Sequence, residues 1–110
     1  MRELFPRLIS AVILCCLALS SATQAQSDPA KFYKTNCVLC HSADGSGDSA
    51  TGKAFHAKDL RSAEVQKQTD AELGEVITKG RGKMPAFGGK IKPDDVKKLV
   101  AYLRALPKQK

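Results

Sequence analysis

The segment that decides the fold is TNCVLCHSADGSG, residues 35–47, in which Cys37, Cys40 and His41 form a Cys-x-x-Cys-His cluster. Thiols and imidazoles bind metal ions, and a pair of cysteines can also close a disulfide or carry thiol chemistry. The glycines, serines and aspartates of residues 42–52 indicate a loop directly after the cluster. The rest of the chain must therefore show what this cluster holds.

The N-terminus has the pattern of a secretory signal peptide. Residues 1–7 carry two arginines and one glutamate, residues 8–19 are the apolar run LISAVILCCLAL, and SSATQA follows with small residues. This order predicts export, with residues 1–25 as a cleaved signal peptide and Ala22 as a second candidate cleavage point. The rival interpretation is a membrane anchor, but the run is shorter than the ~20 apolar residues that a spanning helix needs.

Cleavage would change both the cysteine content and the charge of the chain. Cys15 and Cys16 lie in the apolar run, so the mature chain, residues 26–110, would retain only Cys37 and Cys40. The full sequence has 18 Lys and Arg against 11 Asp and Glu, a formal charge of +7, and loss of two arginines and one glutamate leaves +6. A single domain of this length buries a small core and often needs additional stabilisation. We therefore expect that something other than side chains helps to fill its centre.

The first part of the mature chain predicts one helix followed by a loop. Residues 27–29, Ser-Asp-Pro, favour a helix start with a hydroxyl cap at Ser27 and a proline in the first turn. This helix is expected to run to about Cys40. Residues 54–62 are ambiguous, with at most a helical turn around the sequence KDLRS.

Two further helices have clear boundary signals. Residues 69–72, TDAE, form a capping box that predicts the start of a helix, and Gly80 is expected to end this helix. Residues 81–90, RGKMPAFGGK, are expected to be irregular because of their glycines and proline. The last helix opens at Pro93, and its apolar residues recur with helical spacing: Val96, Leu99, Val100, Leu103 and Leu106. No segment has a strand pattern, so we expect an all-α domain of three to four short helices and long loops.

Four kinds of chemistry are compatible with the Cys-x-x-Cys-His cluster. A structural zinc site needs four ligands, and only His56 could join Cys37, Cys40 and His41. Thioredoxin-like chemistry expects the motif after a strand, and a disulfide inside one helical turn would stabilise little. The fourth is c-type haem attachment, for which Cys-x-x-Cys-His is the signature. On a helix, positions i and i+3 face the same way, so both thiols can reach the two vinyl groups of one haem while the histidine presents its imidazole to the iron.

The second axial ligand is expected to be Met84. Electron-carrier haems with histidine on one side commonly have methionine on the other, and Met84 is the only methionine in residues 26–110. It lies between a lysine and a proline in a glycine-rich loop, whereas a methionine that fills a core gap belongs more naturally on a helix stripe. His56 is the alternative sixth ligand, which would give a bis-histidine haem of lower potential.

With these features the sequence resembles the class I c-type cytochromes, most nearly the small soluble monohaem cytochromes of the cytochrome c-six kind. The resemblance covers nearly all of the mature chain, and the ligand loop of that kind also reads Met-Pro-Ala-Phe-Gly-Gly. It implies a small cytochrome c fold wrapped around one covalently bound haem c. By position, Cys37 and Cys40 would be the thioether cysteines, and His41 and Met84 the axial ligands of the haem iron.

The resemblance also assigns residues around the haem. Tyr33 and Tyr102 occupy the positions of two aromatic residues that pack across each other, and Leu60 lies in a segment that places a leucine on the haem. One feature departs from the family. No proline occurs between the Cys-x-x-Cys-His cluster and Met84, and Lys58 stands where the family has the proline whose neighbouring carbonyl orients the proximal histidine.

An iron with both axial positions filled by protein has no open site for substrate. The sequence therefore predicts a one-electron carrier, not an enzyme, that shuttles electrons between redox partners outside the cytoplasmic membrane. Two alternatives stay open: a haem c subunit fixed within a larger oxidoreductase, and an enzyme or gas sensor with a five-coordinate haem. The expected location is the periplasm or another exported compartment, such as the thylakoid lumen of a phototroph.

The charge pattern predicts the kind of partner. Five basic residues crowd the ligand loop, which in this family flanks the exposed haem edge: Lys79, Arg81, Lys83, Lys90 and Lys92. They favour redox protein partners with acidic docking surfaces. We expect no nucleic-acid partner because the chain is exported, no membrane span after signal cleavage, and a monomer.

Overall fold

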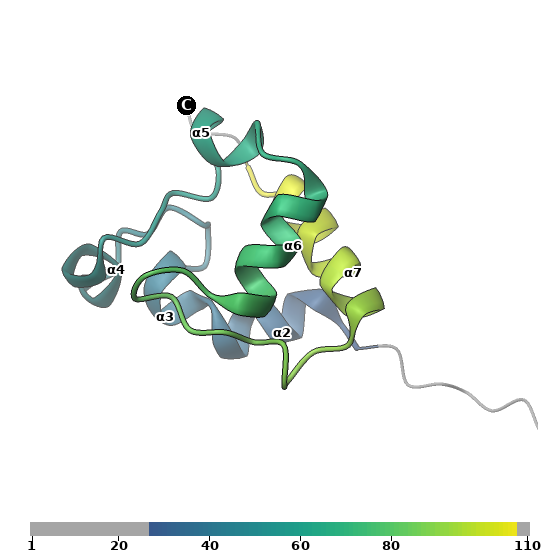
Figure 1. The fold of residues 1–110 in the computed structure, drawn as a ribbon. Helices are drawn as coiled ribbons and strands as arrows, with labels where there is room; N and C mark the ends of the chain where they lie inside the picture. Colours follow the sequence, from purple (N-terminus) through teal and green to yellow (C-terminus); the bar gives the residue numbers. More distant parts are fainter. Residues whose placement is uncertain (1–26, 108–110) are drawn as a thin grey trace, which may run out of the picture.

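The computed structural model describes residues 27–107, so the predicted signal peptide lies outside the described residues (Figure 1). Helical segments alternate with loops along this part of the chain: α2 (Pro29–Asn36), α3 (Val38–His41), α4 (Ala50–Phe55), α5 (Ala63–Gln66), α6 (Asp70–Lys79) and α7 (Pro93–Arg104). Within residues 27–107 the β pairing is limited to an isolated bridge between Arg81 and Met84. The predicted all-α class is confirmed.

The first predicted helix is formed as two segments, α2 and α3. Asp28, and not Ser27 as expected, caps α2, because its carboxylate accepts a hydrogen bond from the backbone N–H of Ala30 at 2.9 Å. The helix is interrupted at Cys37, which has φ −115°, and resumes as the short α3. The N–H of His41 still donates to the carbonyl of Cys37 at 2.9 Å, so the whole Cys-x-x-Cys-His cluster lies on one helical turn.

Two short helices were not predicted: α4 lies across the end of the predicted loop and the start of the ambiguous segment, and α5 lies just after that segment, where no element was predicted. Ser49 caps α4 by accepting from the N–H of Gly52 at 2.9 Å, and Ser62 caps α5 by accepting from the N–H of Val65 at 3.3 Å. The ambiguous segment around KDLRS is a turn and not a helix. Helices of four to six residues cannot show an apolar period, so caps and packing form them here.

The boundaries of α6 and the start of α7 agree with their sequence signals. Thr69 and Glu72 form both bonds of the capping box, at 3.1 Å and 2.7 Å, and Gly80 follows α6 with a φ of +75°. Helix α7 begins at Pro93 and ends at Arg104, three residues before Pro107. The segment between them, residues 80–92, is irregular as predicted and is called the Met84 loop below.

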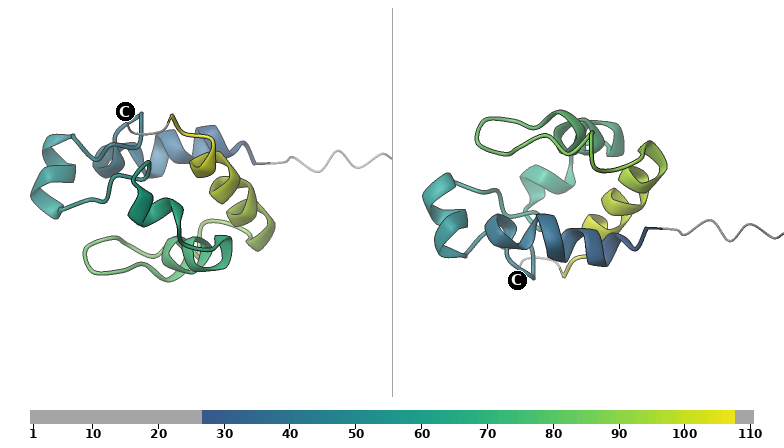
Figure 2. Two further views of the ribbon diagram at one scale, coloured as in Figure 1. Left: turned by 90° about the horizontal axis from the view of Figure 1, so that it is seen from above. Right: turned by 90° about the horizontal axis from the view of Figure 1, so that it is seen from below.

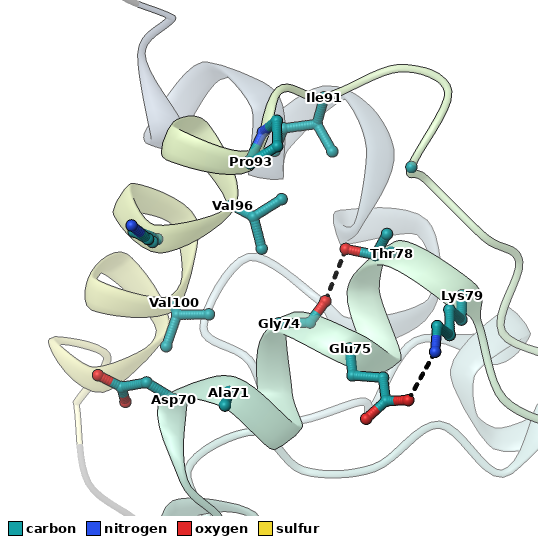
Figure 3. A pocket seen from close by; sticks show the side chains of 12 residues that line it. Asp70, Ala71, Gly74, Glu75, Thr78, Lys79, Ile91, Pro93, Val96 and Val100 are labelled. Carbon is teal, nitrogen blue, oxygen red and sulfur yellow. Dashed lines mark hydrogen bonds and ion pairs between the residues drawn. The ribbon is translucent and has the colours of Figure 1, made fainter.

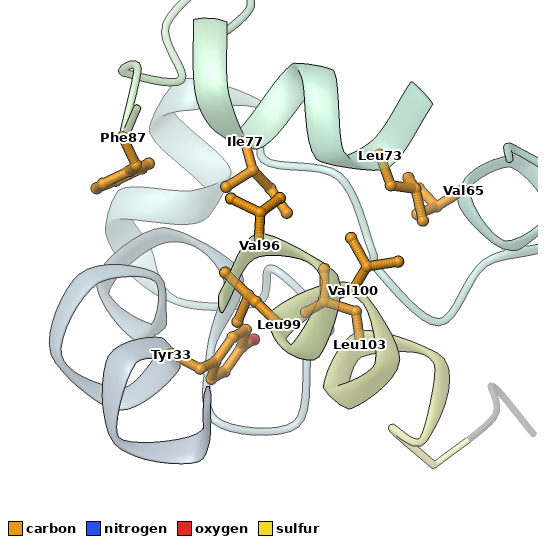
Figure 4. Close-up of a cluster of buried hydrophobic side chains, with 9 residues drawn as sticks. All are labelled: Tyr33, Val65, Leu73, Ile77, Phe87, Val96, Leu99, Val100 and Leu103. Carbon is orange, nitrogen blue, oxygen red and sulfur yellow. The ribbon is translucent and has the colours of Figure 1, made fainter. Parts of the chain in front are cut away.

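The apolar core lies at one end of the molecule, where α2 and α6 both pack against α7 (Figures 1 and 4). Four of the five residues of the predicted α7 stripe are buried, and Leu106 packs against them while partly exposed. The buried residues are Tyr33, Val65, Leu73, Ile77, Phe87, Val96, Leu99, Val100 and Leu103. This core is small, as the length of the chain predicted.

The other end of the molecule is built from α3, α4 and the Met84 loop. Helix α4 packs against α3. In both views of Figure 2, the Met84 loop extends from α6 toward the side of the molecule where α4 lies. The loop and α3 lie on opposite sides of this end of the molecule. The two predicted axial ligands therefore come from separate segments that face each other across this end. Among residues 27–107, no helix combines the length and the apolar character required to cross a bilayer.

Candidate functional site

Both cysteines of the cluster are free thiols at the α2–α3 junction. Cys37 lies between the two helices and Cys40 lies within α3, and each is partly buried. Burial raises the pKa of the Cys37 thiol to about 11, and the neighbouring Cys40 acts in the same direction. Cys37 is therefore a neutral thiol at neutral pH and is not activated for the thiolate chemistry of a redox enzyme.

The ring of His41 is oriented by a backbone carbonyl. Its Nδ1 lies 2.9 Å from the carbonyl oxygen of Lys58, which can only accept a hydrogen bond, so Nδ1 carries the proton and Nε2 keeps its lone pair. Burial lowers the pKa of His41, and the bond to Lys58 opposes this shift without cancelling it. His41 is thus a neutral imidazole with one nitrogen available to a metal.

The Lys58 carbonyl is the partner that the sequence left in doubt, because the family has a proline in this region. A main-chain acceptor needs no particular side chain, so a lysine can take that position. The segment is held by its own backbone bonds: Ala57 donates to the carbonyl of Gly52, and Leu60 donates to that of Gly45, both at 2.8 Å. Next to it, the guanidinium of Arg61 binds the carboxylate of Asp59 at 3.0 and 3.1 Å.

A glycine that sequence reasoning passed over allows α4 to reach α3. A Cβ on Gly52 would lie 2.2 Å from the carbonyl oxygen of Cys40 and 2.4 Å from that of Gly47, closer than any real contact. The hydroxyl of Ser49 also donates to the carbonyl of Leu39 at 2.7 Å. The glycine inside the ATGKAF stretch was the sequence signal for this close approach. Gly52 lets α4 lie directly against the Cys-x-x-Cys-His turn.

Met84 is partly buried and packs against the core cluster. Two hydrogen bonds, at 2.9 and 3.1 Å, join its backbone to Arg81 across a tight turn. The end of the Met84 loop is tied back to α6, because the N–H of Phe87 donates to the carbonyl of Ile77 at 2.9 Å. The alternative ligand, His56, is exposed at the end of α4 in the left-handed conformation.

The aromatic pair that the resemblance implied is present. The ring centroids of Tyr33 and Tyr102 lie 5.3 Å apart, so the last helix contacts the first across this pair. The hydroxyl of Tyr33 donates to the carbonyl of Ser42 at 2.7 Å, directly after His41. Burial raises the pKa of Tyr33, which keeps the phenol protonated. Leu60 is partly buried and packs against the core cluster.

The side chains around the Cys-x-x-Cys-His cluster distinguish haem attachment from a zinc site. Among residues 27–107, no three His, Cys, Asp or Glu side chains come together in a way that would hold a metal ion, so the four-ligand zinc arrangement is not formed there. A groove between α6 and α7, lined by Gly74, Val96 and Val100 among others, includes none of the predicted ligands (Figure 3). Two free thiols on one turn followed by a neutral, oriented imidazole fit the attachment of haem c.

The family is shown by comparison with known proteins. The family model described as "Cytochrome C oxidase, cbb3-type, subunit III" matches residues 24–103. The chain therefore belongs to this family of c-type cytochrome domains. It is an electron-transport protein, and it carries one covalently bound haem c with its iron.

Individual relatives agree with this assignment. Cytochrome c6 from Nostoc sp. is 30% identical over 111 residues, which cover 94% of this chain and 92% of that protein. The Cbb3-type cytochrome c oxidase subunit FixP from Bradyrhizobium sp. is 34% identical over 78 residues, 70% of this chain but only 26% of that protein. A solved structure titled "KustC0563 c-type cytochrome" is similar at a TM-score of 0.68 with 33% identity, covering 74% of this chain and all of that one.

Proposed function

We propose that this protein is a one-electron carrier that shuttles electrons between redox partners outside the cytoplasmic membrane. Its haem c is six-coordinate, with His41 and Met84 as axial ligands and Cys37 and Cys40 as the thioether attachments. The observation that carries the proposal is the hydrogen bond from His41 to the Lys58 carbonyl, which frees Nε2 for iron. The similarity to cytochrome c6 over nearly the whole chain supports a carrier.

Each residue has a distinct part in this function. The haem supplies the Fe(II)/Fe(III) couple. The Lys58 carbonyl holds the ring of His41 and raises its basicity as a ligand. The thioether of Met84 donates less charge to Fe(III) than a second imidazole would, which raises the reduction potential. With both axial positions filled the iron has no place for a substrate, so the protein is proposed to be a carrier and not an enzyme.

The basic residues around the Met84 loop would guide the partner. Lys79 pairs with Glu75 at 2.9 Å. The other four have exposed side chains and form no ion pair with any residue of the described range 27–107: Arg81, Lys83, Lys90 and Lys92. Their charge is therefore available to an acidic docking surface on a redox partner, which steers encounter and orients the complex.

A second candidate function is that of a haem c subunit fixed within a larger oxidoreductase. The description of the matching family model and the similarity to FixP favour it, although this chain spans about a quarter of FixP. The two functions differ in whether the protein is free or stably bound to a larger complex. A carrier elutes at the size of a monomer from the soluble exported fraction, whereas a subunit elutes and purifies with a large partner.

The domain assignment is part of the same proposal. Residues 1–25 are removed as a signal peptide and residues 26–110 form the monohaem domain in the periplasm or another exported compartment. Mass spectrometry of the purified protein should give the mass of residues 26–110 plus one haem. A colourless protein with the mass of bare peptide would overturn the assignment of the thioether cysteines.

The axial ligands are tested by paired variants, Met84→Ala and His56→Ala. The oxidised wild-type protein should show the weak far-red band of sulfur bound to iron, and its couple should lie at positive potential. Met84→Ala should lose this band and bind carbon monoxide when reduced, whereas His56→Ala should behave as the wild type does. Met84→His should lower the potential by on the order of 0.1–0.3 V, a fraction of the ~0.8 V range that axial ligands span. The opposite pattern would assign the sixth ligand to His56.

A further inference from the structure

The tip of the Met84 loop, residues 81–86, has few hydrogen bonds or ion pairs that would hold it in place, although Met84 itself packs against the core cluster. The base of the loop is fixed, because Phe87 and Gly88 donate backbone hydrogen bonds to the carbonyls of Ile77 and Thr78 at 2.9 and 3.0 Å. Between these points, the hydrogen bonds of residues 81–86 are the pair that joins Arg81 to Met84 within the tip itself. No hydrogen bond or ion pair connects this tip to another segment of residues 27–107.

One contact does reach across from the tip to the opposite side of the site. The ammonium of Lys83, the residue before Met84, lies 5.2 Å from the ring centroid of Phe55, within the range of a cation–π interaction. Phe55 is the last residue of α4 and is 49% exposed, one of the two large apolar side chains exposed among the described residues. The position of Phe55 is therefore not explained by burial of its ring in the hydrophobic core. Its ring serves as a platform for Lys83.

This contact joins the two halves of the site. Phe55 is fixed to the histidine side, because α4 packs on the Cys-x-x-Cys-His turn through Gly52 and the carbonyl of Cys40. Lys83 belongs to the methionine side. A bridge between the two restrains the separation of α4 and the Met84 loop, which face each other in Figure 2.

We propose that Phe55 and Lys83 form a clasp that keeps the Met84 loop closed, so that Phe55 is a positioning residue for Met84. The inference rests on the proposed ligation by Met84. When the clasp is broken, the loop opens more often and the position of Met84 becomes accessible to a small ligand from solution. The apparent affinity for such a ligand rises in proportion to the open fraction.

The test uses the purified holoprotein and added imidazole, which can bind ferric iron only when Met84 has left. Phe55→Leu keeps an apolar side chain without the ring face, and Lys83→Met keeps the length of the side chain without the charge. Each should strengthen the apparent imidazole affinity about two- to fivefold, the effect of losing one exposed cation–π contact. Lys83→Arg should restore the wild-type affinity. Lys53→Met, an exposed charge removed from the same helix α4, is the control and should leave the affinity unchanged.

The outcomes separate this inference from the proposed function. If the wild type shows the far-red band but Phe55→Leu and Lys83→Met bind imidazole as it does, the clasp is absent and Met84 ligation stands. An equal effect of Lys53→Met and Lys83→Met would mean that net charge is responsible, which also overturns the clasp. A wild type without the far-red band overturns both. Should Phe55→Leu fail to fold, the comparison of Lys83→Met with Lys83→Arg decides alone, since both change an exposed side chain.

Discussion

At the scale of single residues, the site depends on main-chain carbonyls that accept hydrogen bonds from side chains. The carbonyl of Lys58 fixes the ring of His41, and the carbonyl of Ser42 accepts from the phenol of Tyr33. Ser42 follows His41 directly and has a φ of +65°, which few residues other than glycine adopt without strain. Tyr33 therefore stabilises the unusual backbone that ends the Cys-x-x-Cys-His turn.

Removal of the Tyr33 hydroxyl is expected to lower stability measurably. Tyr33 is 1% exposed, and Tyr33→Phe leaves a part-buried carbonyl without its donor, which should reduce the free energy of unfolding by about 1 kcal/mol. Tyr102→Phe is the matched control, because the Tyr102 hydroxyl has no hydrogen bond to any residue of the described range 27–107, and its cost should stay below about 0.5 kcal/mol. Guanidinium titration of the holoprotein followed by circular dichroism measures both. Equal costs would show that the hydroxyl bond contributes nothing.

Asp59 gives a pH dependence to the segment that orients His41. Its hydrogen bonds from Arg61 hold the pKa of the Asp59 carboxyl below its ordinary value of 3.8, although partial burial acts in the opposite direction. A depressed pKa in the folded state stabilises the protein fully above pH ~4, and the contribution is lost as the pH falls through the folded value. Asp59→Asn should therefore be less stable than the wild type at pH 6, and the difference should narrow at pH 3. Thermal unfolding at the two pH values measures this, and a constant difference would contradict it.

The chemistry of single residues was the part of the site most readable from sequence. Cys37, Cys40 and His41, the proposed attachment and ligand residues, are recognisable because haem c attachment requires those side chains at that spacing. The acceptor for His41 was not recognisable, because a carbonyl at Lys58 has no side-chain signature once the proline of the family is missing. Geometry alone reveals it.

At the scale of elements, the Met84 loop depends on one glycine at its start. Gly80 has a φ of +75°, and a Cβ there would lie 2.6 Å from the carbonyl oxygen of Met84 and 2.9 Å from the N–H nitrogen of Ala86. The turn that presents Met84 therefore closes directly over the backbone of residue 80. A side chain at this position would push the turn away from α6.

Gly80→Ala should displace the Met84 loop. We expect loss of about 1–3 kcal/mol of stability, from the strained backbone and the clash, together with a weaker far-red band in the oxidised protein. Gly89→Ala, in the same loop, is the control, because its Cβ would meet no atom within 4 Å and its backbone has no positive φ. Melting temperature and the far-red absorbance are the two measurements. If Gly80→Ala matches Gly89→Ala in both, the close approach is not what shapes the loop.

Helices were predictable in proportion to their length. The boundaries of α6 and the start of α7 were correct, because each has a capping or proline signal and an apolar stripe long enough to repeat. Helices α4 and α5 were missed because four to six residues contain at most two turns, and their serine caps lie among other loop-forming residues. The packing of α4 on α3 through Gly52 is a tertiary contact that no local pattern could show.

At the scale of the whole molecule, positive charge is concentrated on one loop. Apolar side chains gather between α2, α6 and α7. Eight exposed basic residues of the described range 27–107 form no ion pair within that range, and half of them lie on the Met84 loop: Arg81, Lys83, Lys90 and Lys92. The formal charge of the full chain is +7. A concentration of positive charge beside the site gives the molecule an electrostatic polarity, which acts on reactants before contact.

Small redox reagents of opposite charge can test this polarity without knowledge of the natural partner. Oxidation of the reduced protein by anionic ferricyanide should slow on the order of tenfold as ionic strength rises from about 0.01 M to about 0.5 M, because salt screens the attraction. Oxidation by a cationic cobalt complex should instead become faster. Stopped-flow absorbance at the reduced haem band measures both rates.

Charge-reversal variants localise the effect. Lys83→Glu and Lys90→Glu should each reduce the ferricyanide rate at low ionic strength and flatten its dependence on salt, because both lysines are exposed on the Met84 loop. Lys67→Glu makes the same change of net charge at the end of α5 and should have a smaller effect. If the three variants reduce the rate equally, net charge alone governs encounter. The loop would then have no special part in docking, whatever its residues do for Met84.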